Sequence, residues 1–385
     1  MCGGVNTLGF LRRGQVPVHQ NLVMPDPVHA TEALRGVLDM VVCEDCGFVF
    51  NRAFDPARLS YGQDYDNTQS HSEFFDAYLD LLVEGMVKLH GVRDARVVEV
   101  GCGKGHFLRK LVEYPGASNH GFGFDPSYVG PDSDLDGRLK FRRCFYDAAC
   151  ADVPADVVVC RHVIEHVQDP LGLLRAVHAA LAHSPQARVF FETPCVEWIL
   201  QNRVVWDLFY EHCSLFSRAS LRLAFERTGF IVEDVTHVFG GQYLWLEARL
   251  APSQRPAVRL TGHKTALLAH DFGMDEHALL QEWSERLAEL KLEGRLALWG
   301  AGAKGVTFAN LVDPDCATID CLVDVNPHKQ GCFVPGTGHA IVGPQALVER
   351  GVQNVILMNP NYRQENLQLL QAVGCAANLL DWSEA

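Results

Sequence analysis

Two glycine-rich turns, each directly after a short apolar run, constrain the fold of this chain more than any other feature. The turns occupy residues 101–105 and 300–305, and Asp125 and Asp324 follow at the same separation from the first glycine of each. Glycine lets the backbone turn tightly beside a ligand where a helix begins. An acidic residue at the end of the next strand can accept hydrogen bonds from a ribose diol. The pattern predicts two units, each built as strand, glycine turn, helix and strand.

Residues 71–250 alternate between helical and strand patterns. Apolar residues at helical spacing predict a helix over 74–89, and the run 96–100 predicts a buried strand that ends at the first glycine turn. Further strands are expected at 121–124, 156–160, 188–192, 230–235 and 243–249. Such alternation predicts a mostly parallel sheet covered by helices on both faces, which is an α/β architecture.

Composition divides the chain into three parts. Residues 1–70 are rich in Pro, Asn, Asp and Gly and predict short strands and loops. A polar, proline-bearing stretch at 251–256 is typical of a linker. Beyond it a helix is expected over 275–292, followed by strands at 296–299, 319–323 and 354–358. We therefore expect an N-terminal region over 1–70, a central domain over 71–250 and a C-terminal domain over 251–385.

Net charge and hydropathy exclude two classes of partner. The 385 residues include 33 Lys and Arg against 47 Asp and Glu, a net charge of −14. An acidic chain without a basic run is a poor ligand for nucleic acid. Its apolar runs are far shorter than the roughly 18 to 20 residues that a membrane helix needs, and its first residues lack a basic segment followed by an apolar one. We expect a soluble, cytoplasmic protein with neither nucleic acid nor membrane as partner.

The cysteines indicate reduced thiols and one possible metal site. Thirteen cysteines are spread over the chain, which argues against a disulfide framework. Cys43 and Cys46, in a Cys-x-x-Cys-Gly turn, can present two thiolates to one zinc ion, and Cys2 is a third candidate ligand. The residue that should precede Cys2 by three positions is absent from this chain, so either the start is truncated or a residue such as His19 supplies the fourth ligand. A pair of buried thiols in a turn is the alternative.

The second glycine turn is ambiguous. Its Gly-x-Gly-x-x-Gly spacing after a strand predicts a dinucleotide site if it is considered alone. The competing interpretation is a domain that uses the same geometry without binding NAD. Lys304 lies where the backbone would meet a pyrophosphate, and the segment 326–336 has no counterpart in dinucleotide sites. Both observations favour the second interpretation.

The first glycine turn and its surroundings resemble motif I of class I S-adenosylmethionine (AdoMet) methyltransferases. The likeness rests on an acidic residue two positions before the first glycine, on the Gly-x-Gly-x-Gly spacing, on the acidic end of the next strand and on the segment 156–167. The resemblance implies that the segment 156–167, which contains His162, lies beside the sulfonium of the cofactor. The implied cofactor-binding residues are Glu99, Gly101, Gly103, Gly105, Asp125 and His162.

The whole chain resembles three-part C-methyltransferases related to the sugar C-methyltransferases of deoxysugar biosynthesis. In that group an N-terminal zinc-binding knuckle precedes an AdoMet domain and a Rossmann-like C-terminal domain, which closes over the substrate and carries no NAD. The matching segments are Cys43-x-x-Cys46-Gly47, Glu99-x-Gly101-x-Gly103-x-Gly105, Tyr210-Glu211-His212, Gly240-Gly241-Gln242-Tyr243, Gly300-Ala301-Gly302-Ala303-Lys304-Gly305 and Asp324-x-Asn326-Pro327-x-Lys329-Gln330-Gly331. The likeness implies zinc as well as AdoMet, with Cys2, Cys43 and Cys46 as metal ligands.

Methylation of carbon requires a base, because a proton beside a carbonyl must leave before the enolate can attack the methyl group. Histidine suits this task at neutral pH. By similarity, His212 is the general base, and Glu211 and Tyr210 position the base or the enolate. His166, near the cofactor loop, is a candidate to hold the substrate oxygen, and Tyr65 a candidate to close the site from the N-terminal side.

The sequence therefore predicts an AdoMet-dependent C-methyltransferase acting on a ketone-bearing, nucleotide-linked sugar. One alternative is O- or N-methylation of a small natural-product intermediate. Another is a NAD-binding or scaffold protein with an inactive methyltransferase domain. Since the chain is acidic overall, an anionic substrate would need local cations at the site, and the candidates are Lys304, Lys329 and Arg363.

Overall fold

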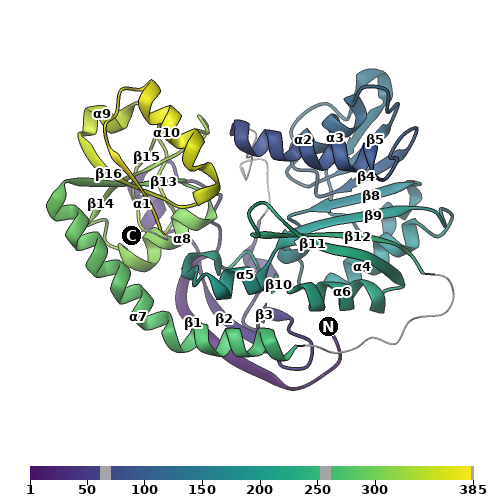
Figure 1. Cartoon of the computed structure of the whole chain (residues 1–385), viewed down its shortest axis with the longest axis horizontal. Coiled ribbons are helices and arrows are strands. Elements are labelled where there is room, and N and C mark those ends of the chain that lie inside the picture. Colours follow the sequence, from purple (N-terminus) through teal and green to yellow (C-terminus); the bar gives the residue numbers. More distant parts are fainter. Residues whose placement is uncertain (61–70, 252–261, 383–385) are drawn as a thin grey trace.

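A computed structural model describes residues 1–60, 71–251 and 262–382. Within these ranges the strands form an N-terminal, a central and a C-terminal sheet (Figure 1). Tyr65 and the expected linker beyond Ala251 lie outside the described residues.

The central sheet has eight strands in the order β11-β12-β9-β8-β4-β5-β7-β6. The five strands from β9 to β7 run parallel, and β12 is antiparallel to both of its neighbours. The bounds are β4 Arg96–Val100, β5 His120–Phe124, β6 Ser133–Asp134, β7 Leu139–Arg142, β8 Val157–Arg161, β9 Arg188–Pro194, β11 Phe230–Val238 and β12 Tyr243–Leu250. The prediction of a mostly parallel sheet is confirmed.

Helices cover both faces of the central sheet, and each face has its own apolar core. On one face, α2 (Glu73–Lys88) and α3 (His106–Glu113) pack over side chains such as Val97 and Phe190. On the other, α4 (Pro170–Ala180) and α6 (Arg218–Arg227) cover Val98 and Phe191. Neighbouring residues of one strand thus enter different cores, as expected for strands buried on both sides.

The C-terminal sheet is a second parallel sheet, as the second glycine turn predicted. Its order is β15-β14-β13-β16-β17. The strands are β13 Arg295–Trp299, β14 Ile319–Val323, β15 Ile341–Val342, β16 Val352–Leu357 and β17 Asn378–Asp381, and the helices are α8 Ala303–Val312, α9 Ala346–Arg350 and α10 Arg363–Ala372. In both parallel sheets the strand before the glycine turn lies at the centre, where the strand order reverses.

The N-terminal sheet differs from the expected short strands and loops. It has the order β1-β2-β3-β10, with β1 Thr7–Pro17, β2 Arg35–Cys43, β3 Val49–Asn51 and β10 Ser214–Leu215, and it is accompanied by α1 Pro27–Thr31. The 11-residue strand β1 carries charged residues such as Arg12 and Arg13, so it lacks the apolar run by which other strands were recognised. Strand β10 comes from the middle of the chain, so residues 1–70 do not form this sheet alone.

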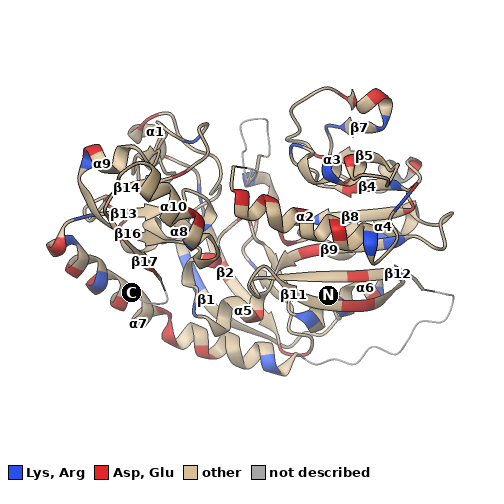
Figure 2. Ribbon diagram, turned by 45° about the horizontal axis from the view of Figure 1, so that its top comes forward, with Lys and Arg blue, Asp and Glu red and all other residues tan. Residues whose placement is uncertain are grey.

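A long helix, α7 (His263–Glu293), runs along the N-terminal sheet to the C-terminal sheet (Figure 1). It begins twelve positions before the expected helix and packs on β1, β2 and α5 (Val196–Gln201). Acidic and basic residues, drawn red and blue in Figure 2, recur along α7, and most of them are exposed. In the described residues, no helix is long and apolar enough to cross a membrane.

Six short 3-10 helices complete the described elements. They are η1 Pro56–Arg58, η2 Leu135–Gly137, η3 Ala148–Asp152, η4 Ile164–His166, η5 Val205–Asp207 and η6 Pro360–Tyr362. Three of them, η4, η5 and η6, contribute residues to the cavity described next.

Candidate active site between the two parallel sheets

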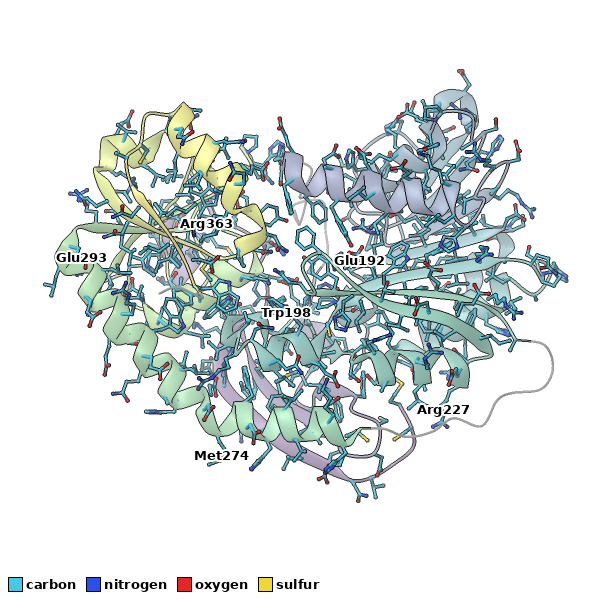
Figure 3. All side chains as sticks on the ribbon, viewed as in Figure 1. Glu192, Trp198, Arg227, Met274, Glu293 and Arg363 are labelled. Atoms are coloured by element: carbon cyan, nitrogen blue, oxygen red, sulfur yellow. The ribbon has the colours of Figure 1, made fainter. Side chains whose placement is uncertain are left out.

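A cavity of about 420 Å³ lies between the central and the C-terminal sheets. Residues at the carboxyl ends of β4, β8, β9, β13, β14 and β16 line it. Ligands of open α/β sheets bind outside the carboxyl ends of strands, where the strand order reverses. The cavity occupies that position in two sheets at once. Figure 3 labels Glu192 on the central side and Arg363 on the C-terminal side.

The first glycine turn forms the floor of the cavity on the central side. Gly101 and Gly103 both line the cavity and have positive φ values of 69° and 53°. A Cβ at Gly101 would lie 2.1 Å from a methyl group of Val163, whereas a Cβ at Gly103 would meet nothing within 4 Å. Gly101 is therefore required for packing, and Gly103 leaves open space beside the backbone.

Gly105 and Asp125 lie directly behind this turn and do not line the cavity. Gly105 is the N-cap of α3, with φ 79°, and provides no side-chain cap. Asp125 Oδ2 accepts a hydrogen bond of 2.8 Å from the Gly103 N–H, and its Oδ1 accepts bonds of 2.7 Å from the N–H and the hydroxyl of Ser127. Asp125, which directly follows β5, therefore stabilises the glycine turn through its side chain.

Glu99 is a buried carboxyl group in the wall of the cavity. Only 3% of it is exposed, and its Oε2 has no hydrogen-bond partner among the residues that the structure describes. Burial raises the pKa of Glu99 to about 8, although nearby Arg161 acts in the opposite direction. An unpartnered buried carboxyl oxygen of this kind suits a positively charged ligand group, which would favour its ionised form.

Arg161, Glu192 and Tyr78 form a buried charged network beside the cavity. Arg161 Nε donates to Glu192 Oε2 at 2.6 Å, and the Tyr78 hydroxyl donates to Glu192 Oε1 at 2.5 Å. Burial alone would raise the pKa of Glu192, but Arg161, His162 and Tyr78 outweigh it and lower that pKa to about 2. Glu192 is therefore an ionised anchor between α2 and β8.

His162 follows β8 and lines the cavity between two buried carboxylates. Its Nδ1 lies 3.4 Å from Glu165 Oε1, and its Nε2 lies 3.5 Å from Glu192 Oε1. Burial lowers the pKa of His162, but the two carboxylates outweigh burial and raise it to about 9. The residue has a positive φ of 53°, which is uncommon for a side chain other than glycine. His162 is therefore held as an imidazolium at neutral pH.

His212 has the opposite electrostatic environment. Its ring lies 4.8 Å from the ring of His166 and 4.0 Å from that of Phe209, measured between centroids. Burial lowers the pKa of His212 well below its ordinary value, and the positive charges of His166, His162 and Lys304 act in the same direction. Within the described part of the chain, its Nδ1 has no hydrogen-bond partner. His212 is therefore a neutral imidazole at pH 7 that can accept a proton.

Glu165, His166 and His212 also meet the spacing of a metal site. Each offers one ligand atom, and these atoms lie within 4.8 Å of one another. Glu165 is fully buried, and its Oε2 accepts a hydrogen bond of 3.0 Å from the Thr193 hydroxyl. The cluster can thus act as an acid–base group or capture a metal ion.

Tyr210 and Glu211, which were expected to position the base or the enolate, do not line the cavity. The Tyr210 hydroxyl accepts a hydrogen bond of 2.9 Å from the Asp55 N–H, and Glu211 Oε2 accepts one of 2.8 Å from the Gln20 N–H. The reason is local. The His212 N–H bonds to the Phe209 carbonyl, which makes a turn in which consecutive side chains point in different directions.

The N-terminal segment contributes a cavity residue that no motif indicated. Glu211, which binds the Gln20 N–H, holds this segment where Asn21 lines the cavity. Asn21 Oδ1 accepts a hydrogen bond of 3.3 Å from Lys329 Nζ. A lone asparagine among many polar residues carries no sequence signal. The same holds for Asp207, which also lines the cavity.

The second glycine turn repeats the geometry of the first. The Ala301 N–H donates to Asp324 Oδ2 at 3.1 Å, as the Gly103 N–H does to Asp125. Lys304 in this turn is directed away from its own loop, because its Nζ forms an ion pair of 2.9 Å with Asp207 of η5.

Two of the three candidate cations line the cavity. They are Lys304 and Lys329, and Lys329 is only 6% exposed. Arg363, the first residue of α10, does not line it.

Cys2, Cys43 and Cys46 come together at the far end of the N-terminal sheet. Their sulfur atoms lie within 4.8 Å of one another, with 3.5 Å between the first two. His19, one of the alternatives for a fourth ligand, lies outside this group: its Nδ1 is 3.5 Å from Glu211 Oε1, and its Nε2 accepts from the Ser60 N–H at 3.1 Å. The Gly262 N–H, at the N-cap of α7, donates to the Asp45 carbonyl, so this turn also supports α7.

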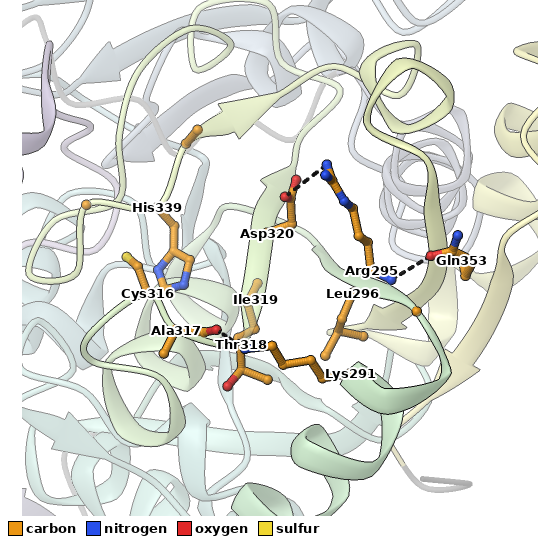
Figure 4. Close-up of a pocket in the computed structure, with 13 residues that line it drawn as sticks. Lys291, Arg295, Leu296, Cys316, Ala317, Thr318, Ile319, Asp320, His339 and Gln353 are labelled. Atoms are coloured by element: carbon orange, nitrogen blue, oxygen red, sulfur yellow. Dashed lines mark hydrogen bonds and ion pairs between the residues drawn. The ribbon is translucent and has the colours of Figure 1, made fainter.

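A second cavity, of about 630 Å³, lies at the amino ends of β13 and β14 (Figure 4). Its polar groups pair with one another. Asp320 faces Arg295 at 3.7 Å, and His339 is bonded to Asp313 and Thr337. These polar groups are already paired, and they lie at the opposite end of the strands from the glycine turn. We therefore do not consider this cavity a candidate active site.

Two family models match the chain over the segments that form the first cavity. Residues 71–235 match the model described as "Methyltransferase domain". This segment is therefore similar to a methyltransferase domain. Residues 261–376 match the model described as "C-methyltransferase C-terminal domain". The first glycine turn lies within the residues that match the first model, and the second lies within those that match the second.

Curated relatives match a shorter part of the chain. The ubiquinone biosynthesis O-methyltransferase of Colwellia psychrerythraea is 28% identical over 127 residues, which cover 31% of this chain and 50% of the relative. That of Azotobacter vinelandii is 32% identical over 117 residues, covering 29% and 48%. The chain thus spans about half the length of these relatives.

Solved structures resemble the chain at low identity. An S-adenosylmethionine dependent methyltransferase from Mesorhizobium loti has 21% identity, covers 44% of this chain and 99% of its own, and has a TM-score of 0.33. The 1,6-didemethyltoxoflavin-N1-methyltransferase of Burkholderia thailandensis, with 1,6-didemethyltoxoflavin and S-adenosylhomocysteine bound, has 16% identity, covers 54% and 97%, and has a TM-score of 0.36.

Proposed function

We propose that this chain is an AdoMet-dependent C-methyltransferase that removes a proton beside a carbonyl group and methylates the resulting enolate carbon. One observation carries the proposal. A neutral, half-buried histidine, His212, lies in a cavity shared by a segment that matches a methyltransferase domain and by a segment that matches the C-terminal domain of C-methyltransferases. The three-part division of the chain, with joins near 70 and 251, belongs to the same proposal.

The central side of the cavity suits AdoMet. Glu99 would face the ammonium group of the cofactor, Gly101 and Gly103 would pass beneath it, and Asp125 would bind the ribose diol. The buried oxygen of Glu99 without a partner and the open space at Gly103 support this fit. When bound, AdoMet supplies an electrophilic methyl group on a sulfonium.

The histidines divide the acid–base work in this proposal. His212 accepts the substrate proton at Nδ1, which has no other partner, and the electron pair of the broken C–H bond moves onto the carbonyl oxygen. His166, whose ring is 4.8 Å away, would hold that oxygen. His162 remains protonated between Glu165 and Glu192 and therefore does not compete for the proton. When neighbouring groups such as His162 and His212 have pKa values shifted in opposite directions, one suits the role of acid and the other the role of base.

The substrate in this proposal is a nucleotide-linked keto-sugar. Lys304 and Lys329 would provide local positive charge for its phosphates, together with the N-terminus of α8, where no side chain caps the first turn. Local cations are needed because the chain as a whole carries a charge of −14.

A structural zinc ion held by Cys2, Cys43 and Cys46 is part of the proposal. Three thiols within 4.8 Å of one another support it, since zinc in structural sites is bound by thiolates at short range. The role assigned to the ion is to hold the turn on which α7 begins.

Hydrogen exchange tests the proposed reaction. A panel of nucleotide keto-sugars is incubated in D2O with the enzyme and without AdoMet. Deuterium should enter the carbon beside the carbonyl, and AdoMet labelled in its methyl group should then give a product with a new carbon–carbon bond. A product labelled on oxygen instead would favour O-methylation, the activity named for the curated relatives.

A further inference from the structure

The N-terminus of α2 is capped by a carboxylate from the opposite side of the cavity. Ser72 is the N-cap residue, and its hydroxyl accepts a hydrogen bond of 3.1 Å from the Phe75 N–H. The same hydroxyl donates to Glu365 Oε2 at 2.6 Å, and the Glu73 N–H donates to Glu365 Oε1 at 2.7 Å. Both oxygens of this α10 carboxylate are thus bound to the first turn of α2. In Figure 1 the start of α2 faces the yellow α10.

This arrangement adds a second acceptor to the Ser72 cap of α2. The first N–H groups of a helix have no partner within the helix and carry partial positive charge. In a capping box, a Glu or Gln three residues after the N-cap bonds back to the helix start. In α2 that position is Phe75, which cannot do so, and Glu365 supplies a carboxylate from outside. Glu365 is also in the first turn of α10, so the carboxylate stabilises two helix ends.

An aromatic contact joins the same elements. The Phe74 ring lies 5.7 Å from the Tyr362 ring and 5.8 Å from the Phe239 ring, and the latter two are 5.9 Å apart. Phe74 belongs to α2, Phe239 to the turn between β11 and β12, and Tyr362 to η6 just before α10. The contact between α2 and the C-terminal segment therefore combines hydrogen bonds with apolar packing.

The capped helix forms one wall of the cavity. Phe75 and Leu79 of α2 line it, and Tyr78 from the same helix donates to Glu192 in the charged network. A change in the first turns of α2 would therefore alter the cavity wall and loosen the group that holds His162. The Glu73 N–H at the start of this helix donates its hydrogen bond directly to Glu365.

We propose that Glu365 is a positioning residue. Its hydrogen bonds to the N-terminus of α2 fix this helix when the C-terminal segment is docked, and α2 in turn forms one wall of the cavity. The strength of these bonds thereby sets how tightly AdoMet and S-adenosylhomocysteine are bound. Glu365 acts through α2 and takes no part in proton transfer. The inference rests on the proposed function only for the identity of the ligand, because the contact between Glu365 and α2 exists within the chain whichever ligand binds.

The test compares Glu365→Ala with Gln364→Ala, its exposed neighbour on α10, in the full chain. Hydrogen exchange of the ligand-free protein should show faster exchange at 73–77 in Glu365→Ala, while the N-terminal sheet and α7 exchange as in the wild type. Calorimetry should show S-adenosylhomocysteine binding weakened by roughly 5- to 20-fold, as expected from the loss of hydrogen bonds to a charged acceptor. Gln364→Ala should match the wild type in both measurements.

Further variants separate this coupling from a general loss of structure. Glu365→Gln keeps one acceptor oxygen and should recover part of the affinity. Ser72→Ala and Glu365→Ala should be non-additive in a double-mutant cycle, because they remove the two sides of one contact. Unchanged exchange at 73–77 in Glu365→Ala, or additive effects in the cycle, would overturn the proposal. If the wild type itself binds neither AdoMet nor S-adenosylhomocysteine, the proposed function fails, and the exchange data alone decide the coupling.

Discussion

Glu192 is the buried anion that holds Arg161 and His162 at the edge of the cavity, so the variant Glu192→Gln tests the electrostatic description of the site. Glu192 is fully buried, and glutamine has nearly the same shape without the charge. The variant leaves the Arg161 guanidinium buried without its ionic partner. Removing one member of a buried ion pair costs about 3 to 5 kcal/mol of stability.

The same variant should change the titration of His162. A pKa of about 9 for this residue, against its ordinary value of 6.5, corresponds to about 3 kcal/mol of stability. A raised histidine pKa contributes stability fully at pH values below about 6.5, and this contribution is lost as the pH rises through about 9. Without the Glu192 charge most of that contribution disappears. The difference in unfolding free energy between wild type and variant should therefore be largest at pH 5 to 6.5 and smaller above pH 9.

Glu192 itself makes the free energy of unfolding depend on pH in the acidic range. Its pKa is lowered to about 2 from an ordinary value of 4.5, so its contribution is present above pH 4.5 and is lost as the pH falls toward 2. Urea unfolding across this pH range, with NMR titration of the His162 ring, measures both effects. The matched control is Glu349→Gln, at an exposed position of α9. A stability loss below about 1 kcal/mol together with an unchanged His162 titration would refute the reasoning.

Two further predictions concern residues outside the cavity. Tyr210→Phe removes the hydroxyl that accepts from the Asp55 N–H, so it should lower the unfolding free energy by about 1 to 2 kcal/mol and leave the rate of methyl transfer close to that of the wild type. A severe loss of methyl transfer at normal stability would mean that Tyr210 touches the substrate. Cys43→Ser should abolish the zinc content measured by elemental analysis of the purified protein and increase hydrogen exchange at the start of α7, with the exposed Cys316→Ser as control. A metal-free wild type of unchanged stability would contradict the zinc proposal.

Most strands of the two parallel sheets were predictable from sequence because they depend on local patterns, whereas β6, β7, β15 and β17 were not expected. Buried parallel strands such as β4 and β13 are mostly apolar, and each glycine turn follows directly. The N-terminal sheet was harder to predict. Strand β1 alternates exposed and buried residues that include arginines, and β10 is only two residues long and pairs with a strand from the beginning of the chain.

The site was predictable where the residues lie next to the glycine turn and not where it depends on long-range contacts. Gly101 and Gly103 line the cavity as the resemblance implied. No sequence motif marked Glu192, because its partners Tyr78 and Arg161 come from α2 and β8, which are distant from it in the sequence. Tyr210-Glu211-His212 contains one residue that reaches the cavity, since adjacent side chains in a turn diverge, and a tripeptide pattern cannot state which one it is.

The central claim is that His212 removes a proton from carbon, and deuterium exchange measures that step directly. With a substrate ketone in D2O and no AdoMet, the wild type should incorporate deuterium beside the carbonyl. His212→Asn should lose this exchange by at least about 100-fold, in the range expected for a general base, while binding S-adenosylhomocysteine as the wild type does. Equal exchange in His212→Asn and the wild type, on a substrate that the wild type methylates at that carbon, would contradict the account.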